Sequence, residues 1–171
     1  MSLTKYTDYI GFHQIAKGGN NDEKIQTYID EIEPTMLRDL LGNTLYDLFI
    51  ADIDPITNKP VTARFLSLYD AFSIDVSLGS GCQERSLGMV EMLKGFVYYS
   101  FVGDSDYFNT ISGNVKNQFS NSLGVSYIQL GLTERYNLGL QTYNVIQWYI
   151  CENSATYPEY NGLNKDVASW L

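Results

Sequence analysis

The chain has 171 residues and a mass of 19.4 kDa, which is the size of one ordinary domain. Hydrophobic residues make up 44% of it, which excludes a disordered tail, and charged residues make up only 18%. Its formal net charge of -9 repels phosphate backbones and argues against a primary role in nucleic-acid binding. No apolar run is long enough to predict a membrane span, and the N-terminus lacks the apolar segment of a signal peptide. The two cysteines, Cys82 and Cys151, are expected to be reduced thiols in a cytosolic protein.

Residues 1–20 are predicted to form an arm that ends at a glycine-rich break. Asn20 is a candidate cap for the helix that follows. Apolar residues then recur at steps of three and four, which predicts a helix over about residues 21–41. Pro34 is expected to kink this helix, and Gly42 is expected to end it.

Three more helices are predicted between residues 45 and 103. A short helix over 45–53 is followed by the loop 54–60, which is rich in turn residues. A third helix is predicted over 62–72, and a looser stretch then continues to residue 83. Residues 84–103 form the most apolar helix of the chain. A helix that is apolar over most of its circumference is usually central, so we expect this one at the centre of the fold.

Residues 104–130 differ from their surroundings, because they are polar with spaced aromatic and β-branched residues and show no helical period. They are predicted to form a long extended loop. The alternative is a two-stranded β-ribbon that turns at Gly113 and Asn114. A structureless segment of this length is rare inside a compact domain and is usually functional.

The last long helix is predicted to begin near Thr133 and to end before Pro158, because the residue before a proline resists helical geometry. The tail 159–171 ends in the apolar pair Trp170-Leu171. The predicted fold class is therefore all-α. We expect one domain over 1–171, a helical bundle with the extended loop or β-ribbon between its last two long helices and with extended N- and C-terminal arms.

The sequence offers little catalytic chemistry. Its one histidine, His13, lies on the predicted arm, and pairing it with Cys82 or with a serine and an aspartate would require the arm to fold over a pocket. No nucleophile elbow, phosphate-binding loop or dinucleotide fingerprint is present. One histidine and two distant cysteines do not supply the four ligands of a zinc site. We therefore expect no catalytic, metal or cofactor site, and we interpret His13 as a surface or arm histidine.

Clustered carboxylates are the other candidates for chemistry. Asp30, Glu31 and Glu33 fall on the predicted polar side of the first helix. Glycoside hydrolysis needs two carboxylates across a cleft, whereas these are expected to form a solvated helix face. Asp104 and Asp106 are expected to be helix-end turn residues, because two spaced aspartates alone do not define a cation site.

Three segments are more typical of partner contact than of catalysis: the arm, the segment 104–130 and the apolar end of the tail. The alternative for each is packing on the protein's own core. A subunit of a ring would use such extensions to reach its neighbours. The residues predicted to contact a partner are Tyr107, Phe108, Ile111, Val115, Phe119, Val125, Tyr127, Trp170 and Leu171.

The order of motifs resembles a known class of proteins. A capped helix over 22–31 leads to the run Leu-Leu-Gly-x-x-Leu-Tyr within 37–48, and the segments 109–117 and 157–162 follow the long apolar helix. This order resembles a family of small proteins in phages and prophages of Bacteroidetes hosts. It is also similar to the wider class of head–tail connector, or neck adaptor, proteins of tailed phages. Residues 73–83 depart from the pattern.

The resemblance implies a helical bundle that forms a ring, typically dodecameric, under the portal protein of the capsid. Such a ring joins the portal to a downstream neck or tail protein, contacts neighbouring copies of itself, and lets DNA pass through its channel without specific binding. The resemblance implies no catalytic residues. The expected location is the neck of the virion, after a period in the host cytoplasm. The alternatives are a soluble non-catalytic binding module or phage assembly factor and, third, an enzyme that uses His13, Cys82 or a carboxylate pair.

Overall fold

The computed structural model describes residues 2–15, 21–76, 82–105, 107–110, 113–116 and 125–161. Within these ranges the chain has four α-helices and three two-stranded antiparallel sheets. The predicted all-α class is therefore wrong, and the fold is mixed α and β. The physical reason is that short segments between the helices alternate in polarity or carry turn residues, so they pair as hairpins.

The described elements follow the chain in a simple order. They are two 3-10 helices (Tyr6–Asp8 and Gly11–His13), α1 (Asn21–Ala51), β1 (Ile53–Asp54), β2 (Lys59–Pro60), α2 (Ala63–Tyr69), β3 (Phe72–Val76), β4 (Cys82–Ser86), α3 (Met89–Ser105), β5 (Tyr107–Thr110), β6 (Gly113–Lys116) and α4 (Val125–Glu152). None of these helices is long and apolar enough to cross a membrane.

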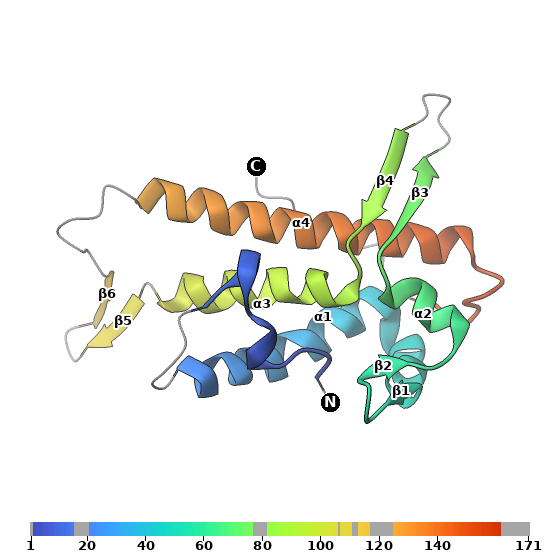
Figure 1. Cartoon of the computed structure of the whole chain (residues 1–171), viewed down its shortest axis with the longest axis horizontal. Helices are drawn as coiled ribbons and strands as arrows, with labels where there is room; N and C mark the ends of the chain where they lie inside the picture. Colours follow the sequence, from blue (N-terminus) through green and yellow to red (C-terminus); the bar gives the residue numbers. More distant parts are fainter. Residues whose placement is uncertain are drawn as a thin grey trace.

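The three long helices lie side by side, with α3 between α1 and α4 (Figure 1). This arrangement explains why the segment around α3 is the most apolar of the chain, since it packs against a helix on each side. The β3–β4 hairpin projects beside α4, and the β5–β6 ribbon lies beyond the end of α3 (Figure 1). The N-terminal arm crosses α3 and α1.

Gly42 interrupts α1 and divides it into two helices. Its φ of 73° and ψ of 163° lie outside helical geometry, in a region where a residue with a Cβ is strained. This agrees with the predicted end of a helix at this glycine. Pro34 lies within α1 and does not divide it, because the residue with non-helical backbone angles inside α1 is Gly42.

Two predicted helix boundaries are displaced. Residues 82–86 belong to β4, so α3 begins at Met89 and not at residue 84. α4 begins at Val125, ahead of the predicted start at Thr133. The apolar residues Val125, Ile128 and Leu132 continue the helical spacing of α4 toward its N-terminus, and this explains the longer helix.

The helices α3 and α4 approach closely at two glycines. A Cβ added to Gly95 would lie 2.8 Å from the carbonyl oxygen of Arg135, and one added to Gly139 would lie 3.1 Å from the carbonyl oxygen of Met92. Glycine is therefore needed for the two backbones to meet at this distance. The main core lies along this contact and continues to α2 and to the second half of α1.

A second, smaller core lies beneath the arm. It is formed by five buried side chains from the arm, α1 and α3: Tyr9, Ile25, Ile29, Val97 and Phe101. The arm therefore contributes to the interior of the protein and does not extend away from it.

Candidate functional site

The residues predicted to contact a partner lie on several elements. Tyr107 and Phe108 belong to β5, Val115 belongs to β6, and Val125 and Tyr127 belong to the first turns of α4. The antiparallel register pairs Phe108 with Val115, so the structure brings these two backbone positions together. The remaining predicted contact residues lie outside the described residues: Ile111, Phe119, Trp170 and Leu171.

The arm is fixed to α1 by a buried carboxylate. Glu33 is 0% exposed, so the predicted solvated face is wrong at this position. Its carboxylate accepts hydrogen bonds from the backbone N–H groups of Leu3 (2.7 Å) and Thr4 (3.1 Å) and from the Thr4 hydroxyl. Burial raises the pKa of Glu33 to about 7, and these hydrogen bonds oppose the shift. A polar contact deep in the fold explains why helical periodicity alone misplaces this residue.

His13 lies on the arm, as expected, but it is buried, so its interpretation as a surface histidine is wrong. Its Nδ1 lies 3.6 Å from Oε2 of Glu91, and the same carboxylate accepts a hydrogen bond from Lys94 at 2.8 Å. Burial lowers the pKa of His13 and favours its neutral form. His13 therefore anchors the arm on α3, with a carboxylate and a cation as its neighbours.

A stack of aromatic and cationic side chains joins the arm to α4. The Arg135 guanidinium lies 4.3 Å from the ring centre of Phe12 and 4.9 Å from that of Tyr98. Its Nε also donates a hydrogen bond to the carbonyl oxygen of Phe12. Cation–π contacts of this kind hold the second 3-10 helix of the arm against both α3 and α4.

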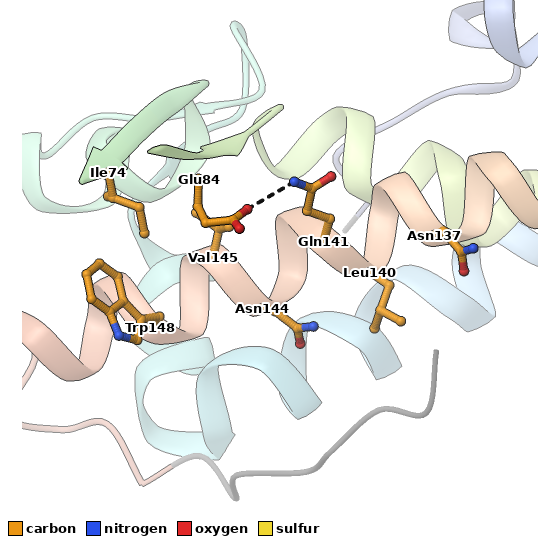
Figure 2. A pocket seen from close by; sticks show the side chains of 8 residues that line it. All are labelled: Ile74, Glu84, Asn137, Leu140, Gln141, Asn144, Val145 and Trp148. Atoms are coloured by element: carbon orange, nitrogen blue, oxygen red, sulfur yellow. Dashed lines mark hydrogen bonds between the residues drawn. The ribbon is translucent and has the colours of Figure 1, made fainter. Parts of the chain in front are cut away.

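A groove of about 520 Å³ lies between the β3–β4 hairpin and α4 (Figure 2). Its apolar lining comes from Ile74 on β3 and from Leu140, Val145 and Trp148 on α4. Figure 2 shows Ile74 above Val145 and Trp148, so the hairpin forms one wall and the helix forms the floor. Trp148 is 38% exposed and is one of the few large apolar side chains that the described chain leaves open to solvent.

The polar lining of the groove is mostly amide. Asn137, Gln141 and Asn144 follow one another along α4, and Gln141 donates a hydrogen bond to Glu84 of β4 at 3.1 Å. A second hollow, which also involves Glu134, shares Asn137 and Gln141 and continues the groove toward the start of α4. Amide side chains beside an apolar floor can hydrogen-bond an extended backbone and accept its side chains at the same time.

The groove was not predicted from the sequence, because the hairpin that forms one wall was missed. The signal was present, since Phe72, Ile74 and Val76 alternate with polar residues at the period of a strand. The expected departure from the connector pattern at 73–83 falls on this hairpin. Among the described residues, no group of three or more histidine, cysteine, aspartate or glutamate side chains is placed to hold a metal ion.

Exposed apolar side chains also occur outside the groove, among them residues of the arm and of the β1–β2 turn. On the arm, Ile10 is 60% exposed, and the rings of Tyr6 and Phe12 on the same segment are exposed as well. Between β1 and β2, Ile56 is 92% exposed. The carboxylate of Asp54 accepts a hydrogen bond from the backbone N–H of Ile56 at 2.9 Å, which holds the turn in the conformation that presents this side chain to solvent.

No family model, no curated protein and no solved structure matches the chain. The interpretation of function therefore depends on the geometry above and on the resemblance of the sequence motifs.

Proposed function

We propose that the chain is a structural virion protein, a head–tail connector or neck adaptor that forms a ring under the portal. In the class that the sequence resembles, this ring is typically dodecameric and joins the portal to the next neck or tail component around the DNA channel. The proposal includes contacts with neighbouring copies and with the portal. It involves no catalytic step.

The observation that carries this proposal is the presence of exposed apolar side chains on two separate elements. Ile10 and Phe12 lie on the arm, and Ile56 lies at the β1–β2 turn. A closed ring requires heterologous contacts, in which one surface of a subunit meets a different surface of the next. Exposed apolar side chains are candidates for such contacts.

The charge of the chain supports the same proposal. A net charge of -9 makes favourable phosphate contacts rare, so DNA would pass the wall of a channel without binding to it. The β5–β6 ribbon and the β3–β4 hairpin are further elements outside the three-helix layer that a portal or a neighbouring subunit would contact (Figure 1).

One observation favours a second candidate, a monomeric binding module or assembly factor. The described part of the arm buries Tyr9 and His13 and is hydrogen-bonded to Glu33 of α1. Such a module needs no extension that waits for a partner. The two candidates differ in the size of the complex that each forms.

Native mass spectrometry tests the proposal on tagged protein recovered, with its partners, from cells that produce phage particles. A ring-sized multiple of 19.4 kDa bound to a second oligomer is expected for a connector. A monomer or dimer bound to one other protein would favour the assembly factor. A monomer that also fails to bind purified portal would contradict the connector proposal.

A pair of arm variants makes this test specific. Ile10→Glu places a charge on the exposed apolar patch, whereas Gln14→Glu adds the same charge at an exposed polar position of the arm. We expect both variants to retain the melting temperature of the wild type, because both positions are exposed. Only Ile10→Glu is expected to reduce ring formation. Equal loss in both variants, or in neither, would remove the arm patch from the interface.

A further inference from the structure

The groove between the β3–β4 hairpin and α4 lies close to the point where the described chain ends. Tyr160 is half-buried against the core, and its side chain forms a hydrogen bond with Gln147 of α4. Gln147 is adjacent in sequence to Trp148, which lines the groove. Residue 161 is the last one described, so the following segment starts just after Tyr160, which contacts α4 one position before Trp148.

The length of this segment suits the length of the groove. The groove extends along α4 from Trp148 to Asn137, a rise of about 17 Å at 1.5 Å per residue. The ten residues 162–171 span at most about 33 Å when fully extended. The segment can therefore turn at Gly162 and run the whole length of the groove in the direction opposite to α4.

The composition of the segment also suits the groove. Leu163, Val167, Trp170 and Leu171 offer apolar side chains for the floor formed by Leu140, Val145 and Trp148. The backbone of the segment can form hydrogen bonds with the amide side chains that line the groove.

Charge points to the same occupant. Glu84 and Glu134 make the walls of the groove acidic, in a chain whose net charge is already -9. The side-chain charges of Lys165 and Asp166 cancel, and Lys165 supplies a cation for the groove carboxylates. An acidic segment would be repelled at this site.

We propose that the segment 162–171 of the same chain binds in the groove and covers Trp148. This proposal is independent of the ring, because it concerns contacts within one subunit. It adds a third wall to the groove and extends the main core along α4.

The two tryptophans of the chain allow a direct test, since one lines the groove and the other lies in the segment. In a Trp148→Phe variant, Trp170 is the only tryptophan, and its quenching by acrylamide reports its exposure. We expect quenching several-fold weaker than in the free synthetic peptide 162–171. Quenching as strong as in the peptide would overturn the proposal.

A pair of variants on one strand shows where the segment binds. Ile74→Asp, in the Trp148→Phe background, places a charge in the groove. Ser73→Asp places the same charge on the exposed position next to it on β3. We expect Ile74→Asp to raise the quenching of Trp170 to that of the peptide, and Ser73→Asp to leave it unchanged, with equal helical circular dichroism for both. Unchanged quenching in Ile74→Asp would show that the segment binds elsewhere.

A second measurement retains Trp148 and does not depend on the Phe substitution. In a Trp170→Phe variant, Trp148 is the only tryptophan, and truncation after Asn161 is expected to increase its quenching and shift its emission to the red. No change on truncation would contradict the proposal. If shielding of either tryptophan appears only at concentrations where sedimentation detects oligomers, the occupant is the segment of a second copy and the proposal of binding within one chain is wrong.

Discussion

The arm and the groove differ in which side chains they bury and which they expose. At the arm, charged and polar side chains are buried, and Glu33 is enclosed by donors from Leu3 and Thr4. At the groove, the apolar side chain of Trp148 is partly exposed, and amides line the opening. The inner side of the arm therefore meets its hydrogen-bonding requirements within the described chain, although Ile10 is exposed on the same segment, whereas the groove leaves the ring of Trp148 partly open to solvent.

We expect the buried contacts of the arm to stabilise the fold and the exposed surface of the groove to serve binding. A buried carboxylate that has several donors is costly to disturb, because removing it leaves those donors without partners. A partly exposed aromatic ring in an open groove contributes less to folding and remains available for contact. The predictions below test this division, beginning with the largest expected effect.

Val97→Asp should unfold the protein. Val97 is fully buried beneath the arm, in the small core that includes Tyr9 and Phe101. An unpaired charge at this position is expected to cost about 3–5 kcal/mol, which is a large fraction of the stability of a small domain. Urea unfolding followed by circular dichroism measures the effect. Val61→Asp is the control, because Val61 is exposed, and it should leave the unfolding midpoint unchanged.

Glu33→Ala should weaken the attachment of the arm. It leaves the backbone N–H groups of Leu3 and Thr4 without their acceptor in a buried site, and we expect a loss of about 1–3 kcal/mol. Urea unfolding gives the free energy, and limited proteolysis should detect faster cleavage within residues 2–15. Glu31→Ala, at an exposed position of the same helix, should change neither. Equal proteolysis in wild type and Glu33→Ala would show that the carboxylate does not hold the arm.

The pH dependence of stability should reveal the same carboxyl group. Burial raises the pKa of Glu33 to about 7 in the folded protein, above the ordinary value of 4.5. Between these two values the folded state holds a proton that the unfolded state has released. Stability should therefore fall as pH rises from 4.5 toward 7, by about 1.4 kcal/mol per pH unit from this group.

Glu33→Gln isolates this contribution. The lowered pKa of His13 acts in the opposite direction, since its stabilising effect is lost as pH falls below the ordinary value of 6.5. Subtracting the unfolding free energy of Glu33→Gln from that of the wild type at each pH cancels His13 and all other shared groups. The difference should become less favourable to the wild type with rising pH. A constant difference would place the pKa of Glu33 at its ordinary value.

Trp148→Ala, measured in a chain that ends at Asn161, should have the smallest effect on folding. With Trp148 already 38% exposed, we expect a loss below about 1 kcal/mol in thermal unfolding. The matched comparison is Leu140→Ala, which removes a buried side chain that lines the same groove and should cost about 2–5 kcal/mol. Similar losses in the two variants would mean that the groove floor is part of the core throughout.

Local sequence signals predicted most of the helical layer. Helical periodicity located α3 and the break at Gly42 because these features depend on spacing and on one residue's backbone freedom. The β3–β4 hairpin was missed because its second strand, Cys82–Ser86, is mostly polar and lacks the alternation that marks a strand. The missed hairpin contributes to the failure of the all-α prediction, together with β1 and β2, which fall in a predicted short helix and loop.

The candidate site was harder to predict than the fold. The burial of Glu33 depends on a contact with Thr4, and the groove depends on a contact between β3 and α4, so neither follows from local pattern. Carboxylates on a polar helix face are usually solvated, and that general rule misplaced Glu33. Partner contact by the residues on β5 and β6 remains a prediction. The structure gives the register of the two strands, in which Phe108 pairs with Val115.

α4 takes part in both the arm contact and the groove, through two residues that are two positions apart. Arg135 stacks on Phe12 of the arm, and Asn137 lines the groove. If occupation of the groove shifts α4 against α3, the free energy of that shift is shared with the arm. Thermodynamic linkage then makes the coupling reciprocal. If docking of the arm changes the affinity of the groove by a given factor, occupation of the groove changes the docking equilibrium of the arm by the same factor.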